Sequence, residues 1–227
     1  MTTPARDAIV ELYRQVGSMV EKYGMLALGE CGGARRWPAR GVYFFLDAEE
    51  PCEFAPSLGR IVRVGTHGLK PGASSTLWGR LRAHKGQADG SGNHRGSVFR
   101  HHVGRALLAR DRADHPTWGV GSSADRKVRV AERELERRVS EYLANLYVTY
   151  VPILDEPGPG SLRGYVERNA ISTLTAERNR WSRGSSGWLG RHSPTAAIEA
   201  SGLWNVRHVG DQVDRGFLDR LDEMVTA

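Results

Sequence analysis

The chain has 227 residues, of which 40% are hydrophobic and 26% are charged. That size and composition suffice for one good hydrophobic core, so we expect a single elaborated domain over residues 1–227. The formal net charge of +6 favours a polyanionic partner, and no stretch approaches the ~20 apolar residues of a membrane-spanning helix.

Cysteine usage and the start of the chain indicate the compartment. Cys31 and Cys52 have neither the spacing of metal ligands nor the density of a disulfide scaffold. The first 14 residues lack the apolar core of a secretory signal. We therefore expect a soluble cytoplasmic protein that is not exported and has no membrane partner.

The first third of the chain predicts a helix followed by two strands. Thr3 is a suitable N-cap, and apolar residues then recur at steps of three and four up to Tyr23. A loop rich in Gly and Arg leads to residues 41–47, which alternate two apolar faces as in a strand covered on both sides. Residues 61–65 predict a second strand, which we expect to pair antiparallel with the first.

The middle of the chain predicts helices and a third strand. Thr76 caps a short predicted helix, and an irregular segment rich in Gly, Ser and Asn follows it. Further helices are expected over residues 98–110, in spite of Gly104, and over 126–146, which has one apolar stripe. Residues 146–153 predict the third strand.

The last part of the chain mixes helices with an expected edge strand. After a Pro- and Gly-rich break, residues 161–176 predict a helix that carries Glu167. A short helix after Ser193, an edge strand over 203–209 and a final helix complete the chain. This order of elements is typical of an α+β fold with a small antiparallel sheet of about three strands, flanked by helices.

Six residues occur in a characteristic order along these elements. They are Tyr43 in Gly41-Val42-Tyr43, Arg63 in Arg63-Val64-Gly65, Arg80 with His84 four residues later, and Glu167 with Asn179 twelve residues later. The ordered set resembles the active site of the GIY-YIG nuclease superfamily, and the Arg-x-x-x-His step is similar to that of its restriction endonucleases. The resemblance covers residues 40–180, which leaves 1–39 and 181–227 as N- and C-terminal extensions of that core.

The resemblance implies a role for each of these residues. Glu167 would hold one Mg²⁺ or Mn²⁺ ion, Arg80 would stabilise charge on the phosphate, and Tyr43 would act as the general base or orient water. His84 would move a proton, orient water or contact phosphate. Asn179 would close the site through its amide.

The residues themselves leave alternatives open at several positions. Glu167 shares a helical stripe with apolar residues, so an ion pair with an arginine at the edge of the core is an alternative to a metal. Arg63 replaces the second tyrosine of the family, and a guanidinium cannot accept a proton, so Arg63 would lower the pKa of Tyr43 or bind phosphate. His67 is the spare candidate for a base.

Two basic clusters are expected to contact the DNA backbone or to read bases, although a solvated surface is the alternative. The first lies in residues 94–112, and the second in 178–191. The predicted DNA-contacting residues are Arg95, Arg100, Arg105, Arg178 and Arg180.

The sequence therefore predicts a Mg²⁺-dependent endonuclease that hydrolyses double-stranded DNA, in a restriction or defence role. We expect the functional groups of Tyr43, Arg80, His84 and Glu167 to converge on one concave surface lined by the first two strands. An inactive DNA-binding or interaction module of the same fold, and an enzyme acting on another phosphodiester, are the alternatives. Cleavage of both strands would call for a homodimer or for sequential nicking.

Overall fold

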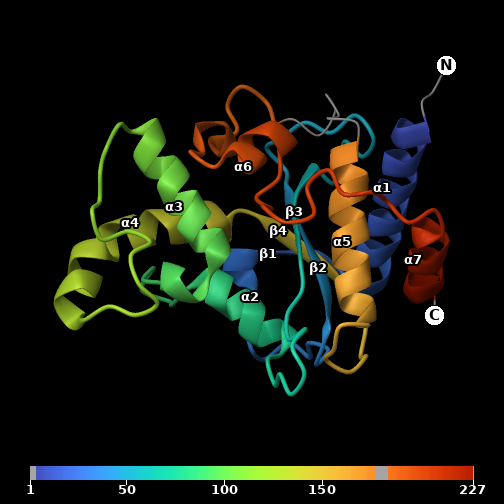
Figure 1. Cartoon of the computed structure of the whole chain (residues 1–227), viewed down its shortest axis with the longest axis horizontal. Coiled ribbons are helices and arrows are strands. Elements are labelled where there is room, and N and C mark those ends of the chain that lie inside the picture. Colours follow the sequence, from blue (N-terminus) through green and yellow to red (C-terminus); the bar gives the residue numbers. More distant parts are fainter. Residues whose placement is uncertain (1–3, 177–183, 227) are drawn as a thin grey trace.

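The computed structural model describes residues 4–176 and 184–226, in which helices pack on both faces of a single antiparallel sheet (Figure 1). The predicted α+β class is therefore confirmed. The helices are α1 (Pro4–Tyr23), α2 (Leu77–Lys85), α3 (Val98–Arg110), α4 (Arg126–Ala144), α5 (Leu162–Thr175), α6 (Ala196–Ser201) and α7 (Phe217–Thr226). The strands are β1 (Leu26–Ala27), β2 (Gly41–Asp47), β3 (Arg60–Gly65) and β4 (Tyr147–Pro152).

The sheet has the strand order β1-β4-β2-β3, and every neighbouring pair is antiparallel. The described residues thus form four strands where about three were expected. The additional strand, β1, has two residues, which is too short for an alternating pattern to reveal. β2 lies between β3 and β4, with Tyr43 opposite both Gly65 and Tyr150.

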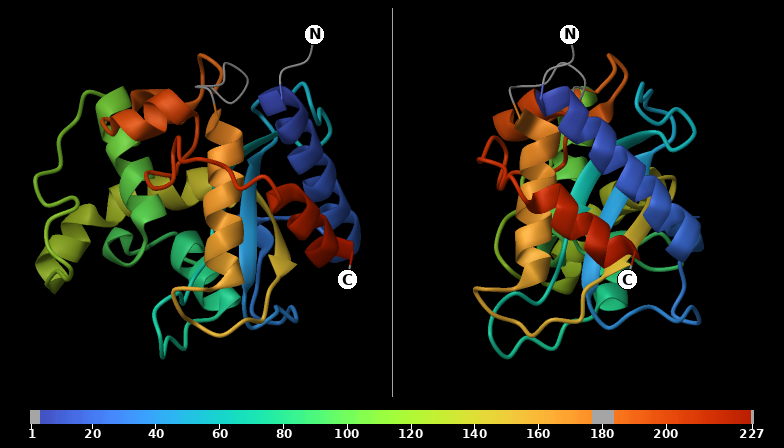
Figure 2. Two further views of the ribbon diagram at one scale, coloured as in Figure 1. Left: turned by 45° about the vertical axis from the view of Figure 1, so that its right-hand side comes forward. Right: turned by 90° about the vertical axis from the view of Figure 1, so that its right-hand side faces the viewer.

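The two faces of β2 belong to two separate hydrophobic clusters, as the alternation in the sequence predicted. Tyr43 and Phe45 pack with apolar residues of α2, α3 and α4. Val42 and Phe44 pack with those of α1, α5 and α7, which lie across the other face of the sheet (Figure 2). Burial of apolar surface at about 25 cal/mol per Å² is the main drive for both layers.

The helices of the first layer begin at side chains that satisfy their free N–H groups. The Thr76 hydroxyl accepts a hydrogen bond from Gly79 N at 3.1 Å, as expected for the predicted cap of α2. The Ser97 hydroxyl accepts one from Arg100 N at 3.2 Å and so begins α3. In the part of the chain described, no helix has the length and apolar character needed to cross a membrane.

The edge strand predicted over residues 203–209 is wrong. Trp204 N donates to Val62 O at 2.7 Å, but no ladder follows. Instead the Asn205 side chain accepts a hydrogen bond from Val64 N at 3.1 Å and donates one to Val64 O at 2.8 Å. One side-chain amide thus replaces a backbone partner and covers part of the exposed edge of β3.

Gly104 lies inside α3 for a steric reason. A Cβ at this position would lie 2.1 Å from Cζ2 of Trp118. The indole therefore packs directly on the helix backbone, and it donates a hydrogen bond from Nε1 to His101 O at 3.1 Å. This close contact explains why a residue of low helix propensity stands in the middle of a helix.

We predict that Gly104→Ala lowers the free energy of unfolding by about 1–3 kcal/mol, because the added methyl forces Trp118 away from α3. Gly17→Ala in α1 is the matched control, since a Cβ there meets no atom within 4 Å. The control should gain up to about 1 kcal/mol from helix propensity. Urea unfolding measures both, and a stabilised Gly104→Ala protein would contradict the packing described above.

Candidate active site

Tyr43 lies at the centre of the sheet, and its side chain is fully buried. It faces Gly65 across the β2–β3 pair. A Cβ at Gly65 would come within 2.4 Å of the Tyr43 hydroxyl oxygen. The ring therefore crosses over the last residue of the second triplet, which requires glycine there whichever residue begins the triplet.

A chain of two hydrogen bonds runs from Tyr43 to the first turn of α3. The Tyr43 hydroxyl lies 2.9 Å from Nε2 of His84, and Nδ1 of His84 lies 2.7 Å from the Ser97 hydroxyl. His84 is fully buried, and this burial, together with nearby Arg80, Arg63 and Arg100, holds its pKa well below the usual value. His84 is therefore neutral, with a single ring proton to donate along this chain.

Arg63 lies on the same face of the sheet as Tyr43 because it pairs with Phe45, two residues along β2 from Tyr43. Its guanidinium carbon is 4.8 Å from the centre of the Phe99 ring, and its Nη1 donates to Trp204 O at 2.6 Å. Burial lowers the pKa of Arg63, and the Tyr43 hydroxyl and the Glu167 carboxylate oppose that change. Its Nε has no hydrogen-bond partner among the described residues.

Glu167 reaches the edge of the sheet from α5, on the face opposite to Tyr43. Thr66 N, just beyond the end of β3, donates to its Oε1 at 3.2 Å. Burial raises the pKa of Glu167, while Arg63, the Thr66 N–H, His208 and Arg80 act in the opposite direction. Buried ion pairs among the described residues lie elsewhere, including Arg60–Glu50, Arg95–Glu132 and Arg100–Glu136.

Arg80 and His67 line a depression of about 340 Å³ beside this edge. Arg80 is half-buried, and its Nη1 donates to Gly96 O at 3.3 Å. Nδ1 of His67 lies 3.0 Å from Ser75 O, which only accepts hydrogen bonds, so Nδ1 carries the proton. Nε2 of His67 then holds a lone pair and has no partner among the described residues. Burial and Arg163 lower the pKa of His67 to about 4.

The structure brings five of the sequence-predicted residues to the end of β3 but arranges them in two levels. The expected convergence of Tyr43, Arg80, His84 and Glu167 on one concave surface is therefore wrong, because Tyr43 and His84 are fully buried. Tyr43, His84 and Arg63 lie inside the protein, and Arg80 and Glu167 lie nearer the surface. The sixth, Asn179, lies outside the described residues. Sequence reasoning missed Ser97, although a serine just before an apolar helix is an N-cap signal.

The expected DNA contact of Arg100 is contradicted by its surroundings. Its side chain is fully buried and forms an ion pair with Glu136, with Nη2 to Oε2 at 2.6 Å. It also donates to His84 O at 2.9 Å and to the Ser140 hydroxyl at 2.9 Å. Releasing a buried charge from its partner costs about 3–5 kcal/mol, so this arginine is structural.

Arg95 is structural for the same reason. Both of its terminal nitrogens contact the Glu132 carboxylate, at 2.6 and 2.8 Å, and only 4% of its side chain is exposed. The part of the 94–112 cluster that contains Arg95 and Arg100 is therefore held inside the protein by ion pairs. Arg105 is exposed on α3 and stays a predicted contact, whereas Arg178 and Arg180 lie outside the described residues.

A family model described as GIY-YIG domain matches residues 4–227. The chain belongs to the GIY-YIG domain family. The match includes most of the segments before residue 40 and after residue 180. Members of this family are typically nucleases that interact with nucleic acid and commonly depend on a metal ion. Searches of the curated proteins and of the solved structures found no match.

The family commonly depends on a metal ion, and Glu167 is the carboxylate at the site that could hold one. Within residues 4–176 and 184–226, no group of three or more His, Cys, Asp or Glu side chains is placed to hold a metal ion. A lone carboxylate suits Mg²⁺, which usually keeps several waters and binds through one or two carboxylates plus substrate phosphate. The burial that raises the pKa of Glu167 is the kind of cost that a bound cation offsets.

The neutral state of His67 predicts a specific loss of stability in acid. Its folded pKa of about 4 lies below the unfolded value near 6.5, so protonation favours the unfolded chain. The stability it contributes is complete above pH ~6.5 and falls by about 1.4 kcal/mol for each pH unit down to ~4.

We therefore expect His67→Gln to lose less stability than the wild type between pH 7 and pH 5. Urea unfolding at both pH values measures this difference and removes any constant effect of the substitution. His192→Gln, at an exposed histidine, is the control and should follow the wild type. Equal pH dependence in all three proteins would show that His67 is not the group responsible.

Proposed function

We propose that the chain is a Mg²⁺- or Mn²⁺-dependent endonuclease that hydrolyses phosphodiester bonds in double-stranded DNA, in a restriction or defence role in the cytoplasm. The observation that carries this proposal is the placement of Glu167. Its carboxylate lies at the end of β3 under the influence of the cations Arg63 and Arg80, and makes no ion pair among the described residues. A structural carboxylate at this depth would be expected to have a paired cation.

Each side chain supports one part of the reaction. Glu167 would hold the divalent ion, which supplies Lewis-acid activation of the phosphate. Arg80 lines the adjacent depression and offers a planar guanidinium to the non-bridging oxygens as charge builds on them. Neither contact needs the deeper residues to move.

Tyr43 would orient the attacking water, or accept a proton from it while passing its own hydroxyl proton to Nε2 of His84. His84 is too weak a base to hold the Tyr43 proton at rest, since its pKa is far below the usual value. It instead accepts the Tyr43 O–H at Nε2 and leaves the tyrosine lone pairs free. Because Tyr43 is enclosed, DNA binding must open a path for water at the end of β3.

Binding without cleavage is the second candidate, and two observations favour it. Tyr43 has no exposed surface, and Arg63 occupies the position of the second family tyrosine while bonded to Trp204 O. Either function uses DNA, for which Arg105, Arg178 and Arg180 remain predicted contacts. One site cuts one strand, so cleavage of a duplex would use a homodimer on DNA or two successive nicks.

Glu167→Gln should separate cleavage from binding. The amide keeps the shape but loses the charge that would hold the metal, so cleavage of plasmid DNA in Mg²⁺ should fall by orders of magnitude. Binding to a duplex in EDTA should persist. Glu199→Gln, at an exposed glutamate on α6, is the matched control. Full cleavage by Glu167→Gln would place the metal elsewhere, and a wild type that binds but never cuts would favour the second candidate.

Ser97→Ala should slow cleavage by about 10- to 100-fold, by analogy with loss of a partner that orients a site histidine. The Ser97 hydroxyl accepts the Arg100 N–H and is placed to accept Nδ1–H of His84, which directs Nε2 to Tyr43. Ser97→Thr keeps the hydroxyl and should retain cleavage.

The loss of the cap alone costs about 0.5–2 kcal/mol, which urea unfolding will report separately. Ser97 has two roles, as the cap of α3 and as the partner of His84. The pH profile of cleavage distinguishes them, because only loss of the contact with His84 should shift that profile. An unshifted profile in Ser97→Ala would reduce Ser97 to a helix cap.

A further inference from the structure

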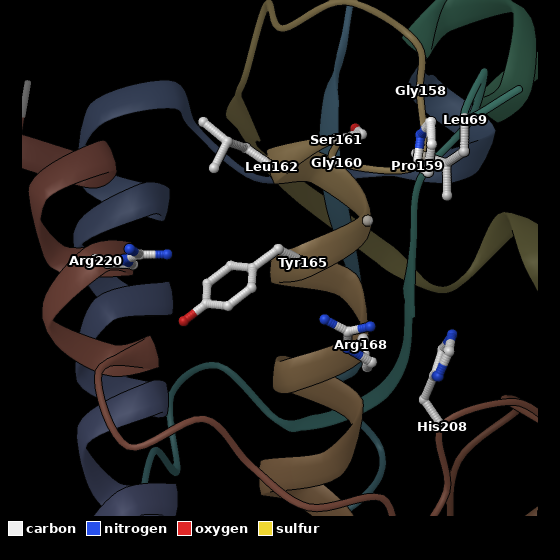
Figure 3. Close-up of a pocket in the computed structure, with 11 residues that line it drawn as sticks. Leu69, Gly158, Pro159, Gly160, Ser161, Leu162, Tyr165, Arg168, His208 and Arg220 are labelled. Carbon is white, nitrogen blue, oxygen red and sulfur yellow. The ribbon is translucent and has the colours of Figure 1, made fainter. Parts of the chain in front are cut away.

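A second cavity of about 390 Å³ lies over the outer face of α5. Figure 3 shows Tyr165 at its centre, with Arg220 on one side and Arg168 and His208 on the other. Leu69 and the loop that contains Pro159 close one end. The lining thus combines three basic side chains with an aromatic ring and apolar walls. None of these residues belongs to the site described above.

His208 is held in this cavity by an unfavourable backbone conformation. Its φ is +62°, in the left-handed region that residues other than glycine rarely occupy. Its carbonyl accepts a hydrogen bond from the Ser172 hydroxyl of α5 at 3.2 Å, which fixes the loop on the helix. Nδ1 lies 2.9 Å from a carboxylate oxygen of Asp211, so Nδ1 carries a proton and Nε2 is left for a ligand. Such strain is typical of a functional position.

The cavity adjoins the candidate active site through two connections. Arg168 directly follows Glu167, and His208 is close enough to lower the pKa of the Glu167 carboxyl against the effect of burial. Thr66 lines the Arg80 depression, whereas Leu69, three residues later, lines this cavity. The two hollows therefore lie on either side of one short loop, with the Glu167 carboxylate bonded to the beginning of that loop.

We propose that this cavity binds the phosphodiester next to the scissile one on the same DNA strand, a subsite that rests on the proposed nuclease function. Arg168 is exposed, and no ion pair among the described residues includes it, so its guanidinium is available to a phosphate. The His208 ring lines the same cavity, with Nδ1 held by Asp211 and Nε2 left for a ligand. The Tyr165 ring, with Arg220 5.3 Å from its centre, provides a face for the attached sugar or base.

The test measures DNA affinity over a series of salt concentrations in EDTA, where no cleavage interferes. Arg168→Gln should weaken binding of a duplex of random sequence and should reduce the slope of log K against log salt by about one unit, the value for one lost phosphate contact. Arg129→Gln is the matched control, because Arg129 is exposed on α4, in the layer on the other face of the sheet (Figure 1). Thermal unfolding of both variants should match the wild type.

The outcomes separate this subsite from the proposed function. A reduced slope in Arg168→Gln with an unchanged slope in Arg129→Gln supports the subsite. Equal slopes in the wild type and Arg168→Gln, with tight binding throughout, overturn the subsite and leave the nuclease proposal intact. Equal losses in both variants show only a general effect of charge and also overturn it. A wild type that binds no DNA at low salt overturns both proposals.

Discussion

The buried Glu136 carboxylate of α4 holds together the layer on which the candidate site depends. One of its oxygens accepts hydrogen bonds from the backbone and the ring of His94, and the other forms the ion pair with Arg100. Arg100 in turn donates to His84 O at the end of α2. The helices α2, α3 and α4, together with the segment around His94, thus share one charge cluster. The placement of α3 against α2 sets the position of Ser97 relative to His84. Breaking such a buried pair costs about 3–5 kcal/mol, so the hydrogen-bond chain to Tyr43 depends on it.

The edge of β3 is the second constraint, because both layers meet there. The regular pairing of Arg63 with Phe45 places Arg63 on the face of the sheet that carries Tyr43. On the other side, α5 brings Glu167 to Thr66 N, which the end of the strand leaves without a ladder partner. Asn205 covers the edge one step earlier through Val64. The edge of β3 is therefore covered by Asn205 at Val64, while the N–H of Thr66 is left to bond the Glu167 carboxylate.

The positive charge of the chain divides into arginines with different tasks. Arg95, Arg100 and Arg163 each pair with a carboxylate inside the protein, where their forked donors satisfy several acceptors at once. Arg105 and Arg168 are exposed and keep their charge available to a polyanion. Net charge alone does not distinguish the two groups, because pairing with a buried acid removes an arginine from the field that DNA would experience.

The sequence by itself determined the α+β class and the two faces of β2, because both depend on the local alternation of apolar residues, and the order of Tyr43, Arg80 and Glu167 led to the prediction of a site. It did not reveal the edge contact of Asn205 or the pairing of Arg100 with Glu136, 36 residues away. Both contacts depend on which side chains meet after the helices pack. Arg100 is then buried against Glu136 and contacts no solvent. Only the tertiary structure decided which charges remain at the surface, because desolvation penalises every buried charge that lacks a partner.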